Sequence, residues 1–339
     1  MTSAPFWTRL LLPRFDWLQI EVTSHCNAAC RYCPHTLYRS HWQSRHLPPA
    51  VFHRLLPIFR KVNLVYLQGW GEPLLHPDFF TFAALARRAG CRVGTTSNAT
   101  LVTDALAARL VEAGLEILAF SLAGIGAHHD LWRPGTSYDQ VIRAIRLVDT
   151  HKRRLGRDTP RIHVAYLLLG SGLSDLAGLP TALSQLGISQ VVISTLDLVA
   201  APALADESLA ALPVAARGAL QKRFDDVKAA GAQHGLRIHV PTLPVPGRPP
   251  VCPEHILQAA VVSAAGDVSP CVYTNLPTAG GWHYVNGLAL PIKSSRFGNI
   301  LQRPFQEIWQ SAKYRSFRRS WQQGQPPPIC QDCLKIKQD

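Results

Sequence analysis

The chain has 339 residues, of which 47% are hydrophobic, so it can bury a full-sized core. No apolar run approaches the roughly 18–20 residues that cross a bilayer, and Arg9, Pro13 and Arg14 interrupt the start without a cleavage site, so we expect a cytoplasmic protein with no membrane contact. The 35 basic and 22 acidic residues give a net charge of +13, which indicates either an anionic binding partner or a generally basic surface. The sequence has no block of Lys and Arg and no aromatic RNA-binding motif, so a nucleic-acid partner is not expected.

Residues 17–240, which follow an N-terminal extension at 1–16, are expected to form one domain of alternating strands and helices. Such alternation is typical of βα units around a parallel sheet. The predicted strands are 17–22, 62–68, 92–96, 117–121, 162–168 and 190–194, with helices at 49–60, 78–89, 103–113, 138–154 and 176–186. A helical segment at 207–234 and a short strand at 237–240 follow. Six units are fewer than the eight that close a barrel.

Three cysteines, Cys26, Cys30 and Cys33, stand directly after the first predicted strand with three and two residues between them. Three thiolates on one loop can hold three corners of a cubane iron–sulfur cluster and leave its fourth iron open to another ligand. A zinc site is the alternative, but zinc loops usually bring a second cysteine pair or two histidines at a fixed distance. His25 and His35 flank the triplet, and we do not expect them to be ligands.

With Tyr32 just before the third cysteine, this spacing resembles the signature of the radical SAM superfamily. The resemblance implies a partial (β/α)6 TIM barrel whose chemistry lies at the carboxyl ends of the strands. It implies that the three cysteines hold a [4Fe–4S] cluster, that the cluster binds S-adenosylmethionine (SAM), and that a 5′-deoxyadenosyl radical then takes a hydrogen atom from the substrate. A reducing partner such as flavodoxin or ferredoxin is implied as well.

The second predicted strand is followed by Gly69, Trp70, Gly71, Glu72 and Pro73. Glycines at a strand end let the backbone approach a ligand closely, and a carboxylate can accept hydrogen bonds from an ammonium group. The segment resembles the family's Gly-Gly-Glu motif, which holds the amino group of SAM. Trp70 stands where the first glycine of that motif often is.

Small polar side chains end the next two strands, namely Ser97, Asn98 and Ser121. They suit a ribose or a carboxylate, although capping of the strand ends explains them equally well. Relatives usually have an aspartate where this chain has Ala123, which leaves Ser121 as the candidate for the ribose contact. Arg133 resembles the arginine that reaches the SAM carboxylate in related enzymes; a solvated loop charge is the alternative.

The run 241–251, with five prolines in its first ten residues, is the predicted linker to a C-terminal domain at 252–339. Cys252, Cys271, Cys330 and Cys333 fit either a tetrahedral zinc site or a fully ligated iron–sulfur cluster. Gly266 is expected to make the turn of a hairpin between the first two. The spacing Cys-x13-Gly-x4-Cys with a later Cys-x2-Cys resembles a SPASM domain, the auxiliary-cluster domain of many radical SAM enzymes, in its shortened one-cluster form, the twitch domain. The resemblance implies one auxiliary [4Fe–4S] cluster, which could accept an electron.

Three functions remain open at this point. The first is an enzyme that oxidises or rearranges a small, anionic biosynthetic intermediate; the second is a peptide- or protein-modifying maturase; the third is an iron–sulfur electron carrier without a substrate. Because the first strand begins near residue 17, we expect no N-terminal peptide-recognition domain and favour the small molecule. The eighth cysteine, Cys91, is expected to be a packed thiol, which argues against epimerisation. No catalytic side chain is predicted.

Overall fold

A ten-stranded curved sheet forms the centre of the computed structural model, which describes residues 14–243 and 251–336. Its strands follow the order β12-β9-β8-β1-β2-β3-β4-β5-β6-β7, and neighbouring strands from β1 to β7 are parallel. These seven strands are β1 (Phe15–Ile20), β2 (Val62–Leu67), β3 (Arg92–Ser97), β4 (Ile117–Leu122), β5 (Arg161–Leu168), β6 (Ile188–Thr195) and β7 (Arg237–His239). The chain therefore has the partial barrel that the sequence predicts.

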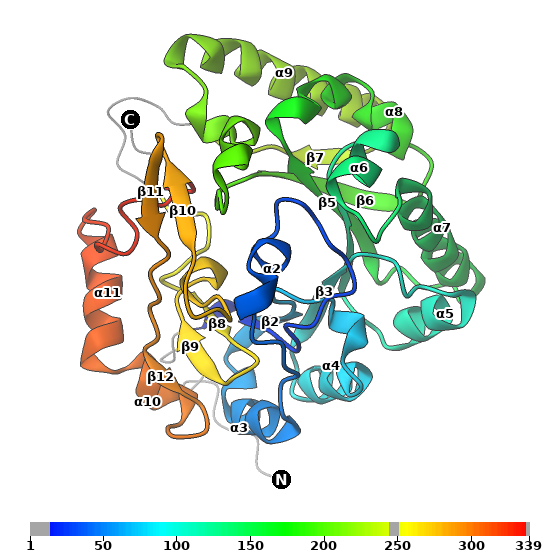
Figure 1. Cartoon of the computed structure of the whole chain (residues 1–339). Coiled ribbons are helices and arrows are strands. Elements are labelled where there is room, and N and C mark those ends of the chain that lie inside the picture. Colours follow the sequence, from blue (N-terminus) through cyan, green and yellow to red (C-terminus); the bar gives the residue numbers. More distant parts are fainter. Residues whose placement is uncertain (1–13, 244–250, 337–339) are drawn as a thin grey trace.

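Helices surround the outer side of this sheet in Figure 1, while the short helix α2 (Pro34–Leu37) lies in its opening. The outer helices are α3 (Pro49–Phe59), α4 (Phe79–Arg88), α5 (Asp104–Glu112), α7 (Tyr138–Arg154), α8 (Leu179–Leu183) and α9 (Val214–Gln233). Helix α7 shows why they form: Ser137 and Gln140 make a reciprocal capping box, and Val141, Ile145 and Val148 bury one face. The short α6 (Ala127–Trp132) follows β4.

The C-terminal part continues the barrel sheet instead of forming a sheet of its own. Strand β8 (Ala259–Val262) pairs in parallel with β1, so that Trp17 lies opposite Ala259. Strands β9 (Asp267–Ser269) and β12 (Gly298–Asn299) then extend the sheet in antiparallel register. The remaining elements are a two-stranded ribbon of β10 (Trp282–Val285) and β11 (Leu288–Pro291), and the helices α10 (Phe305–Trp309) and α11 (Ala312–Gln322).

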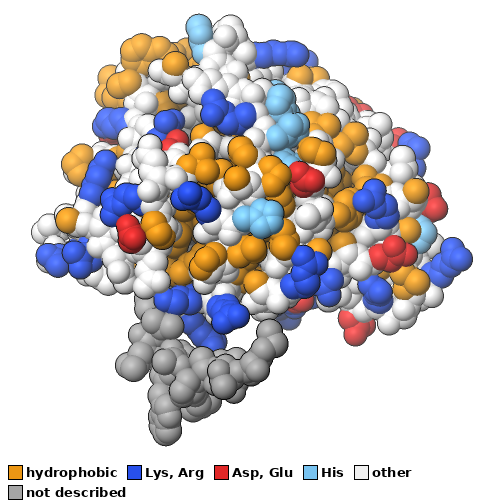
Figure 2. Space-filling model, turned by 90° about the horizontal axis from the view of Figure 1, so that it is seen from below, with side chains coloured by type: hydrophobic (Ala, Val, Ile, Leu, Met, Phe, Trp, Pro, Cys, Tyr) orange, Lys and Arg blue, Asp and Glu red, His pale blue; other side chains and the backbone are white. Residues whose placement is uncertain are grey.

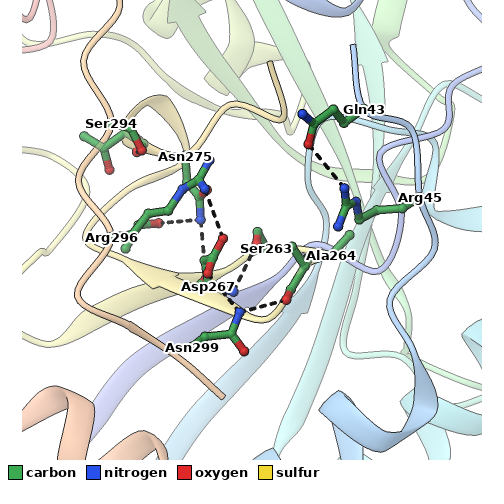
Figure 3. Close-up of polar contacts among 12 residues, drawn as sticks. Gln43, Arg45, Ser263, Ala264, Asp267, Asn275, Ser294, Arg296 and Asn299 are labelled. Carbon is green, nitrogen blue, oxygen red and sulfur yellow. Dashed lines mark hydrogen bonds and ion pairs between the residues drawn. The ribbon is translucent and has the colours of Figure 1, made fainter. Parts of the chain in front are cut away.

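The turn between β8 and β9 is the predicted glycine turn. Gly266 has a φ of +86°, which favours glycine, and its N–H donates to the Ser263 carbonyl at 2.8 Å. Figure 3 shows the side chains that hold this turn: Asn299 donates to the Ala265 carbonyl and to the Asp267 carboxylate, both at 2.9 Å. The turn is thereby fixed to the chain segment that returns as β12.

Two predicted helices differ from the structure. Residues 176–186, predicted as one helix, form the end of a 3-10 segment (Gly170–Ala177) and the short α8, because Gly178 and Pro180 interrupt the regular hydrogen bonding. Helix α9 begins at Val214, not at residue 207, since Pro213 fits only the start of a helix; two 3-10 segments precede it.

Two further boundaries bear on the sequence analysis. Strand β1 begins at Phe15, inside the predicted N-terminal extension, and most of the predicted linker, residues 244–250, lies outside the described residues. None of the helices that the structure describes is long and apolar enough to cross a lipid bilayer.

Candidate functional site

The loop after β1 carries the first three cysteines, all as free thiols. Cys33 precedes α2, and its N–H donates to the Cys30 carbonyl at 3.1 Å, which folds the loop back on itself. Burial raises the pKa of Cys26, and burial together with the charge of Cys30 raises the pKa of Cys33 to about 12. Such thiols stay protonated at neutral pH unless a bound metal stabilises the thiolates.

Backbone hydrogen bonds join this loop to the segment that follows α6. The N–H of Ala29 donates to the Pro134 carbonyl at 2.7 Å, and the N–H of Arg31 donates to the Trp132 carbonyl at 3.0 Å. Gly135 has a φ of +86°, and a Cβ on it would lie only 3.2 Å from the Cα of Ala28. The cysteine loop and the segment around residue 133 thus form one unit.

Arg133 lies in this unit and contacts Tyr32, so the structure brings two of the predicted site residues together. Its Nη1 donates to the Tyr32 hydroxyl at 2.7 Å, and the arginine is only 8% exposed. Its Nε is buried and has no partner among the described residues. Arg133 is therefore a buried cation beside the cysteine loop, and the alternative of a solvated loop charge is wrong.

The glycines after β2 pack directly on the cysteine loop. A Cβ on Gly69 would clash with the side chain of Glu21, and a Cβ on Gly71 would clash with the carbonyl oxygen of His25. The N–H of Glu72 donates to that same carbonyl at 2.9 Å. The two glycines are needed for close packing of two loops, whatever ligand the site binds.

Glu72, Ser97 and Asn98 form one buried hydrogen-bond network. The Glu72 carboxylate accepts from the Ser97 hydroxyl at 2.9 Å, from the Asn98 N–H at 2.6 Å and from the Leu74 N–H at 3.2 Å. Glu72 is 2% exposed, and burial raises its pKa despite these bonds. A carboxylate has about four acceptor positions, so one remains for a ligand. The side chain of Ser121 makes no hydrogen bond within the described part of the chain.

Trp70 and Pro73 complete the predicted set. The Trp70 ring lies 6.2 Å from the Trp42 ring and 6.0 Å from the Tyr273 ring, measured between centroids, so it connects the glycine segment 69–73 to the C-terminal part. Pro73 begins a 3-10 turn, Pro73–Leu75.

Buried polar atoms without hydrogen-bond partners gather near the first three cysteines. Among the described residues they are Thr36 Oγ1, Trp70 Nε1, Trp132 Nε1 and Arg133 Nε. An unpaired buried donor costs about 1–3 kcal/mol, so several in one place indicate a ligand that would pair them. A polar cofactor at this site fits the arrangement.

The four C-terminal cysteines line one cavity. Burial raises the pKa of Cys252 to about 11 and that of Cys330 to about 12, and the charges of neighbouring cysteines act in the same direction. The Cys271 sulfur lies 3.8 Å from the Thr274 hydroxyl. The cavity therefore collects all four thiols that the sequence assigns to this site.

The donor set of this cavity decides which kinds of metal site it can hold. Four cysteine thiols are the ligands of a fully ligated iron–sulfur cluster, and they also suit a tetrahedral zinc ion. The cavity therefore fits the auxiliary cluster that the cysteine spacing implies, without excluding zinc by itself.

Sequence analysis missed three charged groups at these sites, one buried and two partly buried. Glu21, which is buried, accepts from the N–H of Trp70 at 2.9 Å and from the N–H of Ala264 at 3.0 Å, which joins β1, the glycine segment 69–73 and the β8–β9 hairpin. Lys335 forms an ion pair with Glu254 in the wall of the C-terminal cavity. The one available signal was position: Lys335 and Glu254 each stand two residues after a cysteine.

Two family models match the chain. The model of the radical SAM superfamily matches residues 20–168, and the model of an iron–sulfur cluster-binding domain matches residues 252–334. Together they cover both cysteine sites.

Curated relatives match over nearly the whole chain. A tungsten-containing aldehyde ferredoxin oxidoreductase cofactor-modifying protein of Pyrococcus furiosus is 26% identical over 94% of this chain and 86% of its own. An AdoMet-dependent heme synthase of Methanosarcina barkeri is 24% identical over 94% of this chain and 86% of its own.

Solved structures share the fold. The structure of anSMEcpe with bound AdoMet has a TM-score of 0.66 and 19% identity, covering 89% of this chain and 79% of that one. Streptococcus suis SuiB bound to S-adenosylmethionine has a TM-score of 0.65 and 14% identity, covering 97% of this chain and 73% of that one. The chain belongs to the radical SAM superfamily, with the SAM-binding [4Fe–4S] cluster and the auxiliary iron–sulfur cluster of its C-terminal domain.

Proposed function

We propose that this enzyme removes a hydrogen atom from a small biosynthetic intermediate, namely a cofactor or a cofactor precursor with anionic groups. The observation that carries the proposal is similarity over the full chain to proteins named as a cofactor-modifying protein and a heme synthase. The peptide-bound neighbours, by contrast, are below 20% identity and speak only for the fold. Peptide modification is the second candidate.

A small buried apolar cluster joins the cysteine loop to the C-terminal part. Leu169, Leu196, Val199 and Leu204 form this cluster, separate from the main core. Tyr32 of the cysteine loop packs against it, and Tyr284 and Leu334 of the C-terminal part do so too. This packing holds the cysteine loop in a fixed place between the barrel and the C-terminal domain, as a reaction that depends on the position of its substrate requires.

The cysteine triplet would hold the SAM-binding cluster, and the four C-terminal cysteines would hold the auxiliary cluster. When bound, the first cluster and SAM supply a 5′-deoxyadenosyl radical that abstracts hydrogen. The protein supplies position: Arg133 with Tyr32 would bind the SAM carboxylate, and Glu72 would bind its amino group beside the backbone of residues 69–73. Ser97 and Asn98 hold the Glu72 carboxylate in place, and Ser121 is left for the ribose.

The net reaction is proposed to be an oxidation or a rearrangement, with the auxiliary cluster as the electron acceptor and a flavodoxin or ferredoxin as the reducing partner. Epimerisation would need a thiol to return hydrogen to the product radical. Cys91 does not suit this role, because its thiol is buried and donates to the Phe59 carbonyl at 3.1 Å, at the amino end of β3.

Transfer of deuterium to 5′-deoxyadenosine tests the substrate class. The anaerobically assembled enzyme is incubated with SAM, reductant and an extract of deuterated cells that ultrafiltration has divided into small molecules and macromolecules. We expect deuterated 5′-deoxyadenosine, measured by mass spectrometry, from the small-molecule fraction alone. Transfer only from the macromolecular fraction would favour the peptide-modifying alternative, and a Cys30→Ala variant serves as the blank.

A further inference from the structure

A partly buried ion pair lies in the wall of the auxiliary cavity. The ammonium group of Lys335 contacts the carboxylate of Glu254, and each side chain is 19% exposed. The same ammonium lies 5.0 Å from the centroid of the Tyr273 ring, on which a cation is favourably placed. All three residues line the cavity together with the four cysteines.

The two members of this pair and Tyr273 all come from the cysteine segments themselves. Glu254 stands two residues after Cys252, Tyr273 two after Cys271 and Lys335 two after Cys333. The positive charge is therefore held in a fixed place relative to three of the four thiols. A second pair in the same wall, Lys293 with Asp332, is 50% and 44% exposed and is screened by solvent.

We propose that Lys335 is a positioning residue that sets the reduction potential of the auxiliary cluster, with Glu254 and Tyr273 holding its charge in place. Reduction adds one electron, and hence one negative charge, to a cluster whose surroundings exclude much of the water. A fixed cation stabilises that reduced state and raises the potential, whereas a fixed carboxylate opposes it. The inference rests on the proposed function, in which this cluster accepts the electron from the product.

A purely structural role for the pair makes a different prediction. Lys335→Gln and Glu254→Gln both break the ion pair, so a structural role would give both variants the same kind of change. An electrostatic role gives opposite changes: the potential falls when the cation is removed and rises when the carboxylate is removed. Lys335→Arg keeps the charge and should stay near the wild-type potential.

The experiment is a redox titration of the full-length protein with both clusters assembled, followed by electron paramagnetic resonance without substrate. SAM identifies its own cluster by changing that signal. We expect Lys335→Gln to lower the midpoint potential of the auxiliary cluster, Glu254→Gln to raise it, and Lys293→Gln to leave it unchanged. The SAM-binding cluster should keep its potential in every variant.

Shifts of the same sign in the two variants, or no shift in either, would overturn the proposal. If Lys335→Gln fails to retain iron, the other two variants still test the proposal. The midpoint potential of the auxiliary cluster should rise in Glu254→Gln and stay at the wild-type value in Lys335→Arg. Because no substrate is used, a wrong substrate class leaves the result intact. A wild-type protein with only one cluster signal would instead refute the auxiliary cluster as electron acceptor.

Discussion

Glu72 shows how a single side chain connects the glycine segment 69–73 to the end of the neighbouring strand β3. Glu72→Ala would leave the Ser97 hydroxyl and the N–H groups of Leu74 and Asn98 without their acceptor. An unpaired buried donor costs about 1–3 kcal/mol, so we expect a clear loss of stability in urea and weaker SAM binding by calorimetry. Ser97→Ala is the comparison: it removes the bond to Glu72 and the bond from the Ala99 N–H, about 1 kcal/mol each, but keeps the carboxylate, so it should weaken SAM binding less than Glu72→Ala does. A larger loss of SAM affinity in Ser97→Ala would place Ser97 against the ligand.

Glu21 makes stability depend on pH. Burial raises its pKa from 4.5 to about 7, although the two backbone N–H groups and Arg45 lower it. Between these pH values the folded chain holds the proton more tightly than the unfolded chain, so stability should fall as pH rises from about 4.5 to about 7. Urea unfolding across this range measures the slope, and Glu21→Gln, which cannot titrate, should flatten it. An equal slope in that variant would assign the effect to other groups.

Most strands and helices, like the two sets of cysteines, could be predicted from the sequence, whereas the contacts between distant elements could not. Strands β2 to β6 agree with the predicted runs to within two residues, because buried parallel strands are short, apolar and bounded by turn residues. The prediction of one helix at 176–186 was wrong. The apolar residues are spaced as in a helix, but Gly178 and Pro180 interrupt the regular hydrogen bonding. The cysteine sets were found by spacing alone.

The contacts inside the site depend on side-chain direction at separate strand ends. The bond from Ser97 to Glu72 joins the ends of two neighbouring strands, and the bond from Ala264 to Glu21 joins segments that lie far apart in the chain. No local pattern encodes either pairing. The same is true of the parallel register between β1 and β8.

Close packing of the glycine loop on the cysteine loop gives a prediction for these two segments. Gly71→Ala would push a Cβ into the carbonyl oxygens of Thr23 and His25, which cannot move without shifting the cysteine loop. The variant should lose the SAM-binding cluster and retain the auxiliary one, about half of the roughly eight irons of two cubanes. Gly218→Ala in α9, where a Cβ meets nothing, is the control and should keep all its iron. Full iron content in Gly71→Ala would contradict the packing argument.

At the scale of the whole molecule, charge should control the encounter with a protein electron donor. The chain has a net charge of +13, and blue Lys and Arg side chains spread over the left part of Figure 2 with few red carboxylates among them. We expect the rate of reduction by an acidic flavodoxin to fall steeply with added salt, because steering of opposite charges is screened. Stopped-flow absorbance measures it, and reduced methyl viologen, a cation, should show no such fall. A flat profile with flavodoxin would argue against a charged docking step.

The pairing of β8 with β1 also affects how the chain is made. The first strand of the barrel leaves the ribosome early, but its outer neighbour in the sheet is synthesised only after the whole barrel and the proline-rich segment. Until then the edge of β1 is unpaired and can pair with strands of other chains. Such an unpaired edge is a known cause of aggregation. A barrel cut off before β8 would carry that open edge permanently. The C-terminal domain thus supplies, through β8, the strand that covers the edge of the barrel sheet, and we expect the barrel and the C-terminal domain to fold as one cooperative unit.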